Sequence, residues 1–275
     1  MLGGGESRPR DMKDWSVVRD NAPAQDEAPA PEAPSFGKRV LGWLTEVLLV
    51  VVGAIIIAAL LRTFVGQMFL IPSGSMENTI HEQDRVLVAK FGGFQRGDVV
   101  VFEDPGEWLA PSQKPTNPVQ IGLEFIGVLP SSSTEHLIKR VIGMPGDHVL
   151  LNDEGQIEVN GQPLDESAYL FTLDGVQVAP ATVPFDIIVP ADHIFVMGDH
   201  RNASNDSRCR LADVSQNPGQ SAFVPMDKVV GSAVAIVAPL DRLSTFNLPA
   251  TFTTVPDPVE PAPERPELIH VESGC

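Results

Sequence analysis

The sequence predicts a mainly β protein, in which a single N-terminal transmembrane helix precedes an all-β domain and the tails at both ends are disordered. Three observations lead to this prediction. One apolar segment is long enough to cross a bilayer, and the runs after it are short and rich in Val and Ile. Both ends of the chain are rich in Pro and acidic residues. The 275 residues suffice for one good-sized core or two small ones.

The N-terminal region contains the predicted tail and the predicted anchor. Residues 1–39, which include "NAPAQDEAPAPEAP", lack apolar periodicity and are expected to be disordered. The segment 40–61, "VLGWLTEVLLVVVGAIIIAALL", follows. As a helix it would span about 33 Å, and a hydrocarbon core is about 30 Å thick. Its length and the acidic segment before it indicate an uncleaved anchor and not a cleaved signal peptide.

The charges at the two ends of the anchor predict its orientation. Lys38 and Arg39 border the N-terminal end, whereas Arg62 alone borders the other end. The positive-inside rule then places the tail 1–39 in the cytoplasm and everything after Arg62 outside it. The β domain is therefore expected to be extracytoplasmic.

Residues 62–250 are predicted to form the β domain, because short β-type runs alternate there with turn residues. The runs are "DRVLVAKF", "GDVVVFED", "HLIKRVIGM", "DHVLLND", "QIEVNGQPL", "FDIIVPADHIFVMGD" and "KVVGSAVAIVAPL". Residues 104–134 break this rhythm and are predicted to be an insertion, whose apolar "VQIGLEFIGVL" either packs on the core or touches the membrane surface. Pro and acidic residues return at 251–275, which is predicted to be a disordered C-terminal tail.

Composition excludes several classes of function. The net charge of −17, from 36 acidic and 19 basic residues, argues against nucleic acid as a partner. The six histidines have no zinc-helix spacing and no neighbouring Cys pair, so neither a metal nor another cofactor is expected. Two cysteines, Cys209 and Cys275, are too few for a disulfide framework, and the sequence leaves open whether they form one bridge.

A serine turn lies ten residues after the anchor, in "IPSGSMENTI". Pro72 restrains the backbone and Gly74 allows a sharp turn between Ser73 and Ser75. Such a turn can aim one hydroxyl at a substrate, and a backbone N–H with the other hydroxyl at a developing oxyanion. A serine hydroxyl is a weak nucleophile that needs a base, and a neutral lysine can serve.

Lys139 is the candidate for that base among the lysines after the anchor, which are Lys90, Lys114, Lys139 and Lys228. In "HLIKRVIGMPGD" it is flanked on both sides by apolar strand residues, and strand alternation separates it from Arg140. Burial would lower the pKa of its amine, as a base at neutral pH requires. The alternative is a lysine whose stem packs while its amine reaches water. The third candidate stretch, "MGDHRNASNDSR", is rich in polar residues. It is either an ordinary loop or a hydrogen-bonded scaffold that holds a serine beside that lysine.

Together these stretches resemble bacterial type I signal peptidases (leader peptidases), the membrane-anchored serine–lysine proteases. "PSGSM" resembles the nucleophile box of that family, "GDVVVF" the next box, "IKRVIGMPGD" the lysine box and "GDHRNASNDSR" the last box, in the same order and after an anchor. The resemblance implies a mostly β extracytoplasmic catalytic domain in the bacterial cell membrane. It also implies removal of signal peptides from exported preproteins after A-x-A-like small-residue sites.

The resemblance assigns roles to individual residues. It makes Ser75 the nucleophile, Lys139 the general base, and the Ser73 hydroxyl with the Ser75 N–H the oxyanion hole. Ser204 would orient the lysine. The remaining matches are a supporting pair and three residues that would bind substrate, namely Asp206 with Arg208, and Ile71, Met76 and Ile138.

Some positions depart from the most common pattern of the family. Glu77 and Asn78 stand where Met-Pro is common, His200 stands where Asn is common, and Ala203 where Asn often occurs. No departure removes an expected catalytic group. The expected partners are preproteins and membrane lipid, and the oligomeric state stays open. The rival interpretations are a self-cleaving repressor, for which no DNA-binding signal exists, and a membrane-anchored, non-catalytic β domain that binds a partner.

Overall fold

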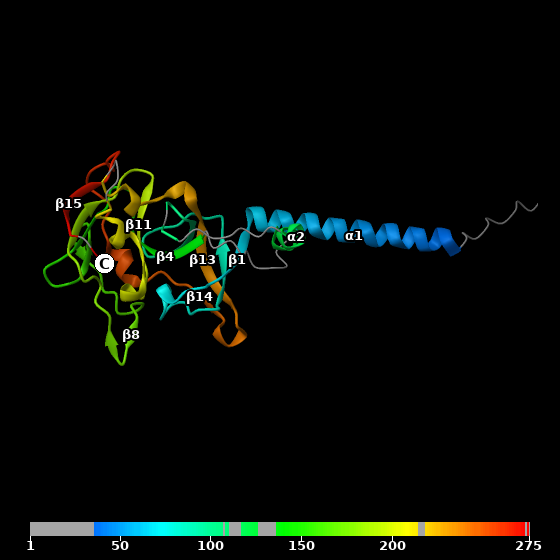
Figure 1. Ribbon diagram of the computed structural model, residues 1–275, viewed down its shortest axis with the longest axis horizontal. Helices are drawn as coiled ribbons and strands as arrows, with labels where there is room; N and C mark the ends of the chain where they lie inside the picture. The colour runs from blue at the N-terminus through cyan, green and yellow to red at the C-terminus, as the bar shows by residue number, and fades with distance from the viewer. Residues whose placement is uncertain are drawn as a thin grey trace, which may run out of the picture. The chain divides into compact units, whose positions relative to one another are not determined.

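The computed structural model of the protein describes residues 36–106, 108–109, 117–125, 136–213, 218–272 and 274. The predicted tail 1–39 lies outside this part of the chain except for its last four residues, which already belong to a helix. That helix, α1 (Phe36–Phe64), contains the predicted anchor (Figure 1). Within it, Arg39–Leu60 has a mean hydropathy of 2.5 and is long and apolar enough to cross a membrane.

The strands after α1 form two main antiparallel sheets, as predicted for a mainly β domain, within the compact unit Leu49–Cys275. The first sheet has the order β1-β2-β13-β3-β4-β11-β12, with β14 paired to β13. Its strands are β1 (Gly66–Leu70), β2 (Arg85–Ala89), β3 (Val99–Glu103), β4 (His136–Gly143), β11 (His193–Met197), β12 (Val224–Pro225), β13 (Val229–Ala238) and β14 (Ser244–Thr245). Since β3 and β11 flank β4, the "HLIKRVIG" segment is an interior strand of this sheet.

The second sheet has the order β15-β10-β5-β6-β7, and β8 with β9 forms a separate hairpin. These strands are β5 (His148–Leu151), β6 (Ile157–Val159), β7 (Gln162–Pro163), β8 (Thr172–Leu173), β9 (Val176–Gln177), β10 (Phe185–Ile188) and β15 (Glu267–Val271). Short 3-10 helices connect many strands: η1 (Gly74–Met76), η2 (Arg201–Ala203), η3 (Ser207–Arg210), η4 (Gln220–Ala222), η5 (Met226–Lys228), η6 (Leu240–Arg242) and η7 (Ala250–Thr254).

The expectation of a disordered tail at 251–275 is wrong for the residues that the structure describes. Phe252 in η7 is only 5% exposed and packs in the hydrophobic core of the second sheet. Strand β15 pairs with β10 and forms the edge of that sheet (Figure 1). Cys209 is disulfide-bonded, and the other cysteine of the chain, Cys275, lies outside the described residues. Composition did not predict this ordered structure, because only a few apolar residues anchor a segment that is otherwise polar.

The predicted insertion at 104–134 begins inside the core. Trp108 is 4% exposed, packs edge-on against Phe102 and donates its indole N–H to the Ser221 carbonyl at 2.8 Å. Helix α2 (Pro118–Phe125) follows, and its Val119 and Ile121 side chains are exposed. These two side chains therefore do not pack on the core, the first of the two alternatives that the sequence left open. Residues 107, 110–116 and 126–135 lie outside the described part of the chain.

Candidate active site

The serine turn directly extends the first two strands of the sheet. Beyond the β1–β2 ladder, the Ile71 N–H donates to the Asp84 carbonyl at 3.0 Å and the Gln83 N–H donates to the Ile71 carbonyl at 2.9 Å. The chain is still extended at Ser73, with φ −141° and ψ 153°, and then turns into η1. Ser75 is the middle residue of this short helix and is 6% exposed. Its hydroxyl therefore projects from a backbone that the sheet holds in place.

Lys139 meets Ser75 from the interior strand β4. Its Nζ atom lies 2.6 Å from Ser75 Oγ, and the lysine side chain is almost completely buried. The two residues that the sequence paired are 64 positions apart in the chain. A separation of 2.6 Å is the distance at which a proton passes between a base and a hydroxyl.

The surroundings of Lys139 favour the neutral amine. Burial lowers its pKa from the ordinary 10.5 to about 8, while Asp206 and Asp199 oppose this change and Arg208 supports it. Burial dominates because the charged form loses its hydration, while no carboxylate of the described residues forms an ion pair with the amine. The lysine can therefore supply a neutral amine near physiological pH.

Arg140, the next residue on β4, lies on the opposite face and forms a buried ion pair. Its Nε and Nη2 atoms donate to the Asp199 carboxylate at 2.8 and 2.6 Å, and Nη1 donates to the Gly97 carbonyl. Thr79 donates to the same carboxylate. Sequence reasoning did not pair Arg140 with Asp199. The signal that could have found them is a charge inside an apolar strand, which needs a buried partner.

Asp206 and Arg208, the predicted supporting pair, form an ion pair with 2.9 Å between Oδ2 and Nη2. The Asp206 carboxylate also accepts the Gly198 N–H at 2.9 Å and the Arg208 N–H at 3.2 Å. Burial raises the pKa of Asp206, but the Arg208 guanidinium and these hydrogen bonds outweigh burial and hold the pKa below its ordinary value. The carboxylate thus stays charged and fixes the loop that carries Ser204.

Ser204 and Ser73 occupy different surroundings. Ser204 Oγ is buried and, among the described residues, makes no hydrogen bond that meets normal geometry, although it lies close enough to the Asp206 carboxylate to help lower the pKa of that group. Gly198 is required beside it, because a Cβ there would lie 2.3 Å from Ser204 Oγ and 2.5 Å from the Ser75 carbonyl oxygen. Ser73 is exposed, and its hydroxyl does not cap η1.

The three predicted substrate-binding residues lie together in the core beneath the serine turn. Ile71, Met76 and Ile138 are 2%, 0% and 6% exposed and belong to one hydrophobic cluster with the β2 and β3 side chains. Met76 has no exposed surface, so a peptide in the site could reach only the edges of Ile71 and Ile138. Their contact with substrate stays a prediction.

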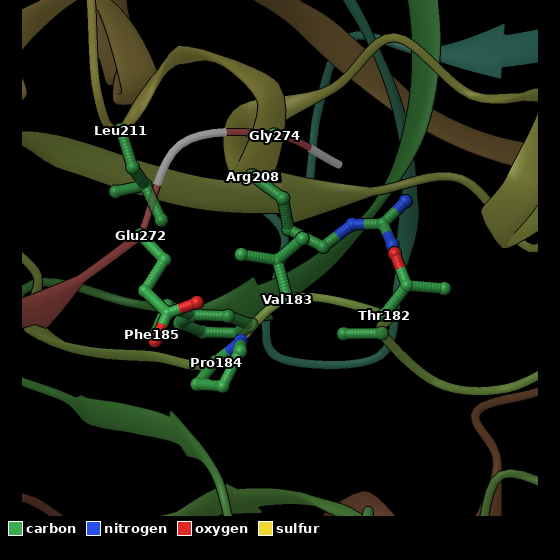
Figure 2. Close-up of a pocket in the computed structure, with 9 residues that line it drawn as sticks. Thr182, Val183, Pro184, Phe185, Arg208, Leu211, Glu272 and Gly274 are labelled. Atoms are coloured by element: carbon green, nitrogen blue, oxygen red, sulfur yellow. The ribbon is translucent and has the colours of Figure 1, made fainter.

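Two hollows among the described residues have walls close to this site, and neither is lined by Ser75 or Lys139. A groove of about 480 Å³ opens on the Arg140 face of β4, where Thr79 and Tyr169 also line it. A cavity of about 10 Å³, room for roughly one water molecule, lies between Arg208, Thr182 and the C-terminal residues Glu272 and Gly274 (Figure 2). Glu272 and Gly274 therefore line the same small cavity as Arg208. Among the described residues, no cluster of His, Cys, Asp or Glu could hold a metal ion.

Comparisons with known proteins agree on one family. The family model described as "Signal peptidase, peptidase S26" matches residues 44–238. Signal peptidase I of Mycobacterium tuberculosis is 32% identical, and the alignment covers 81% of this chain and 80% of that protein. Signal peptidase I of Leptolyngbya laminosa is 33% identical, with 84% of this chain and 94% of that protein covered. A solved signal peptidase I from Enterococcus faecalis is 22% identical, covering 52% of this chain and 97% of that one, with a TM-score of 0.28.

The family model spans most of the chain. The alignments of this chain with the two sequence relatives cover most of the length of those relatives. Members of this family are serine endopeptidases that act on preproteins bearing signal peptides, and the relatives are anchored in the membrane. The chain belongs to the signal peptidase family, peptidase S26, and removes signal peptides.

Proposed function

We propose that Ser75 and Lys139 carry out the signal-peptide cleavage, with Ser75 as the nucleophile and neutral Lys139 as the general base. The observation that carries this proposal is the buried 2.6 Å contact between Lys139 Nζ and Ser75 Oγ. The lowered pKa of Lys139 supports it, since a base that is neutral at working pH can accept the hydroxyl proton.

In the proposed reaction, Ser75 Oγ attacks the carbonyl carbon of the scissile bond while its proton passes to Lys139 Nζ. The carbonyl oxygen becomes an oxyanion, which accepts hydrogen bonds from the Ser75 N–H and the Ser73 hydroxyl. The C–N bond then breaks, and Lys139 returns the proton to the leaving amine. A water molecule, deprotonated by the same lysine, hydrolyses the acyl-enzyme and frees Ser75.

The exposed position of Ser73 suits its proposed part in this step. Its hydroxyl is not engaged as a cap of η1, so it can turn toward a bound carbonyl. Ser204, whose buried hydroxyl lies beside the Asp206 carboxylate, is proposed to orient Lys139. The Asp206–Arg208 ion pair supports Ser204 by fixing the loop that carries this serine.

We assign substrate choice to the small space around the serine turn. The side chains of Ile71, Met76 and Ile138 are packed in one cluster and leave little exposed surface, so we expect only small substrate side chains to be accepted beside Ser75. This favours cleavage after A-x-A-like sites in exported preproteins.

The proposed membrane arrangement places 1–39 in the cytoplasm and the β domain outside, with α1 in contact with lipid. Few residues separate the apolar span Arg39–Leu60 from the serine turn, so the turn stays near the membrane–water boundary. The bond that a signal peptidase cuts emerges at that boundary. Protease added to the outer membrane face should digest the β domain and leave residues before Lys38 intact; the opposite pattern would contradict this orientation.

The function is tested with purified full-length protein in lipid vesicles and an exported preprotein that carries an A-x-A site. The wild type should release the mature protein, with an N-terminus directly after the site, and Ser75→Ala should not. An acylating serine inhibitor should label the wild type at Ser75 alone. Unlabelled protein together with an uncut preprotein would favour the rival interpretation, a membrane-anchored β domain that binds without catalysis.

A further inference from the structure

His200 contacts two neighbouring carbonyl groups, those of Gly74 and Ser75, in the serine turn. Its backbone N–H donates to the Ser75 carbonyl at 3.1 Å. Its ring Nδ1 lies 3.3 Å from the Gly74 carbonyl oxygen. The ring stacks on Phe171 with 3.8 Å between the ring centroids, and the Phe171 N–H donates to the Asp199 carbonyl. The imidazole is therefore held in place from a different element than the turn it contacts.

Glu77 completes this arrangement from the other side of the turn. Its backbone N–H donates to the Gly74 carbonyl at 3.0 Å, and its Oε2 atom lies 3.2 Å from His200 Nδ1. The Gly74 carbonyl oxygen, 3.3 Å from Nδ1, can only accept hydrogen bonds. Nδ1 must therefore carry a hydrogen, whichever form the rest of the ring takes. The ring thus donates into the space between the Gly74 carbonyl and the carboxylate.

The Gly74 carbonyl and the Ser75 N–H belong to one peptide unit, which is planar and trans, so they point in opposite directions. Fixing the carbonyl consequently fixes the direction of the N–H. Glycine on one side makes this unit easy to rotate, because no Cβ restricts Gly74. The Glu77 carboxyl carbon lies only 2.9 Å from the point where such a Cβ would be, so the side chain covers that side of the turn.

We propose that His200 and Glu77 are positioning residues that hold the Gly74–Ser75 peptide in the orientation in which the Ser75 N–H faces the oxyanion. This inference rests on the proposed function, since it needs Ser75 to form the tetrahedral intermediate. An interaction that matters only when the oxyanion forms raises kcat and leaves the binding of substrate unchanged. The pair thus affects kcat, while KM depends on other contacts.

The test compares His200→Leu and His200→Asn in the full-length protein, with a peptide that spans an A-x-A site as substrate. Loss of an oxyanion donor lowers kcat about 100-fold or more. If the Ser75 N–H is only free to rotate away from the oxyanion, kcat should fall at least about tenfold. His200→Leu should show that loss with KM within about twofold of wild type. His200→Asn keeps a donor near the Nδ1 position and should recover most of kcat.

His193 offers a matched control, because its half-buried ring also contacts a backbone carbonyl, that of Ala191, but lies outside the serine turn. His193→Leu should leave kcat unchanged. Glu77→Ala, at a partly exposed residue, provides a second variant if His200→Leu does not fold, and it should also lower kcat and not raise KM.

Ser75→Ala separates this inference from the proposed function. If Ser75→Ala abolishes cleavage while His200→Leu and Glu77→Ala retain wild-type kcat, the positioning role is wrong and the nucleophile assignment stands. A change in KM alone, or an equal loss in His200→Asn and His200→Leu, would also overturn the positioning role. If Ser75→Ala cleaves normally, the proposed function fails first.

Discussion

The pH dependence of cleavage should follow the titration of Lys139. Its pKa is about 8, so the neutral amine is present in about 1% of molecules at pH 6, about 10% at pH 7 and about 90% at pH 9. If the neutral form is the base, kcat/KM should rise about tenfold per pH unit below 8 and level off above it. The direction follows from burial, because burial disfavours the charged amine.

The assay measures initial rates of peptide cleavage between pH 6 and pH 9.5 at constant ionic strength, at substrate concentrations below KM. Circular dichroism over the same range serves as the control that the domain stays folded. A flat profile, or a rate that still rises about tenfold per pH unit up to pH 9.5 as the ordinary lysine value of 10.5 requires, would refute the assignment of Lys139 as a base that burial makes neutral.

Three further predictions concern stability and packing. Lys139→Met should raise the free energy of unfolding at pH 7 by up to about 3 kcal/mol, because below pH 8 the folded wild type must bury a charged amine; the gain should fade as pH rises from the folded pKa of about 8 toward the ordinary value of 10.5, and urea unfolding at pH 7 and pH 10 checks it. Gly198→Ala should lose most cleavage activity, since its Cβ would lie 2.3 Å from Ser204 Oγ and 2.5 Å from the Ser75 carbonyl oxygen; wild-type rates would contradict this packing. Phe252→Ala should destabilise the domain by about 3–5 kcal/mol in the same unfolding assay, whereas no change would restore the expectation of a disordered tail.

The sequence predicted the elements whose signals are local. The anchor is a continuous apolar run, and the structure places it within α1. The strands alternate in polarity or are continuously apolar, and turn residues separate them. The contact between Ser75 and Lys139 is not local, and strand alternation alone left open whether the lysine amine reaches water. The resemblance to a family, and not periodicity, paired the two residues.

The parts that were missed depend on contacts that no periodic pattern records. Composition predicted a disordered C-terminal tail, but β15 gains its order by pairing with β10, and Phe252 gains its place from the core. The Arg140–Asp199 ion pair joins two charges that are 59 positions apart. The sequence marks His200 only as a departure from the common pattern of the family, because its contact with the Gly74 carbonyl exists only after the chain has folded.

The most direct test of the central claim compares Ser75→Ala, Lys139→Arg and the double variant for cleavage of one preprotein. Lys139→Arg is the informative change, because a guanidinium remains protonated at any workable pH and cannot accept the serine proton. If the two residues act as one unit, each single variant should lose nearly as much rate as the double variant. Ordinary cleavage by folded Lys139→Arg protein would contradict the account.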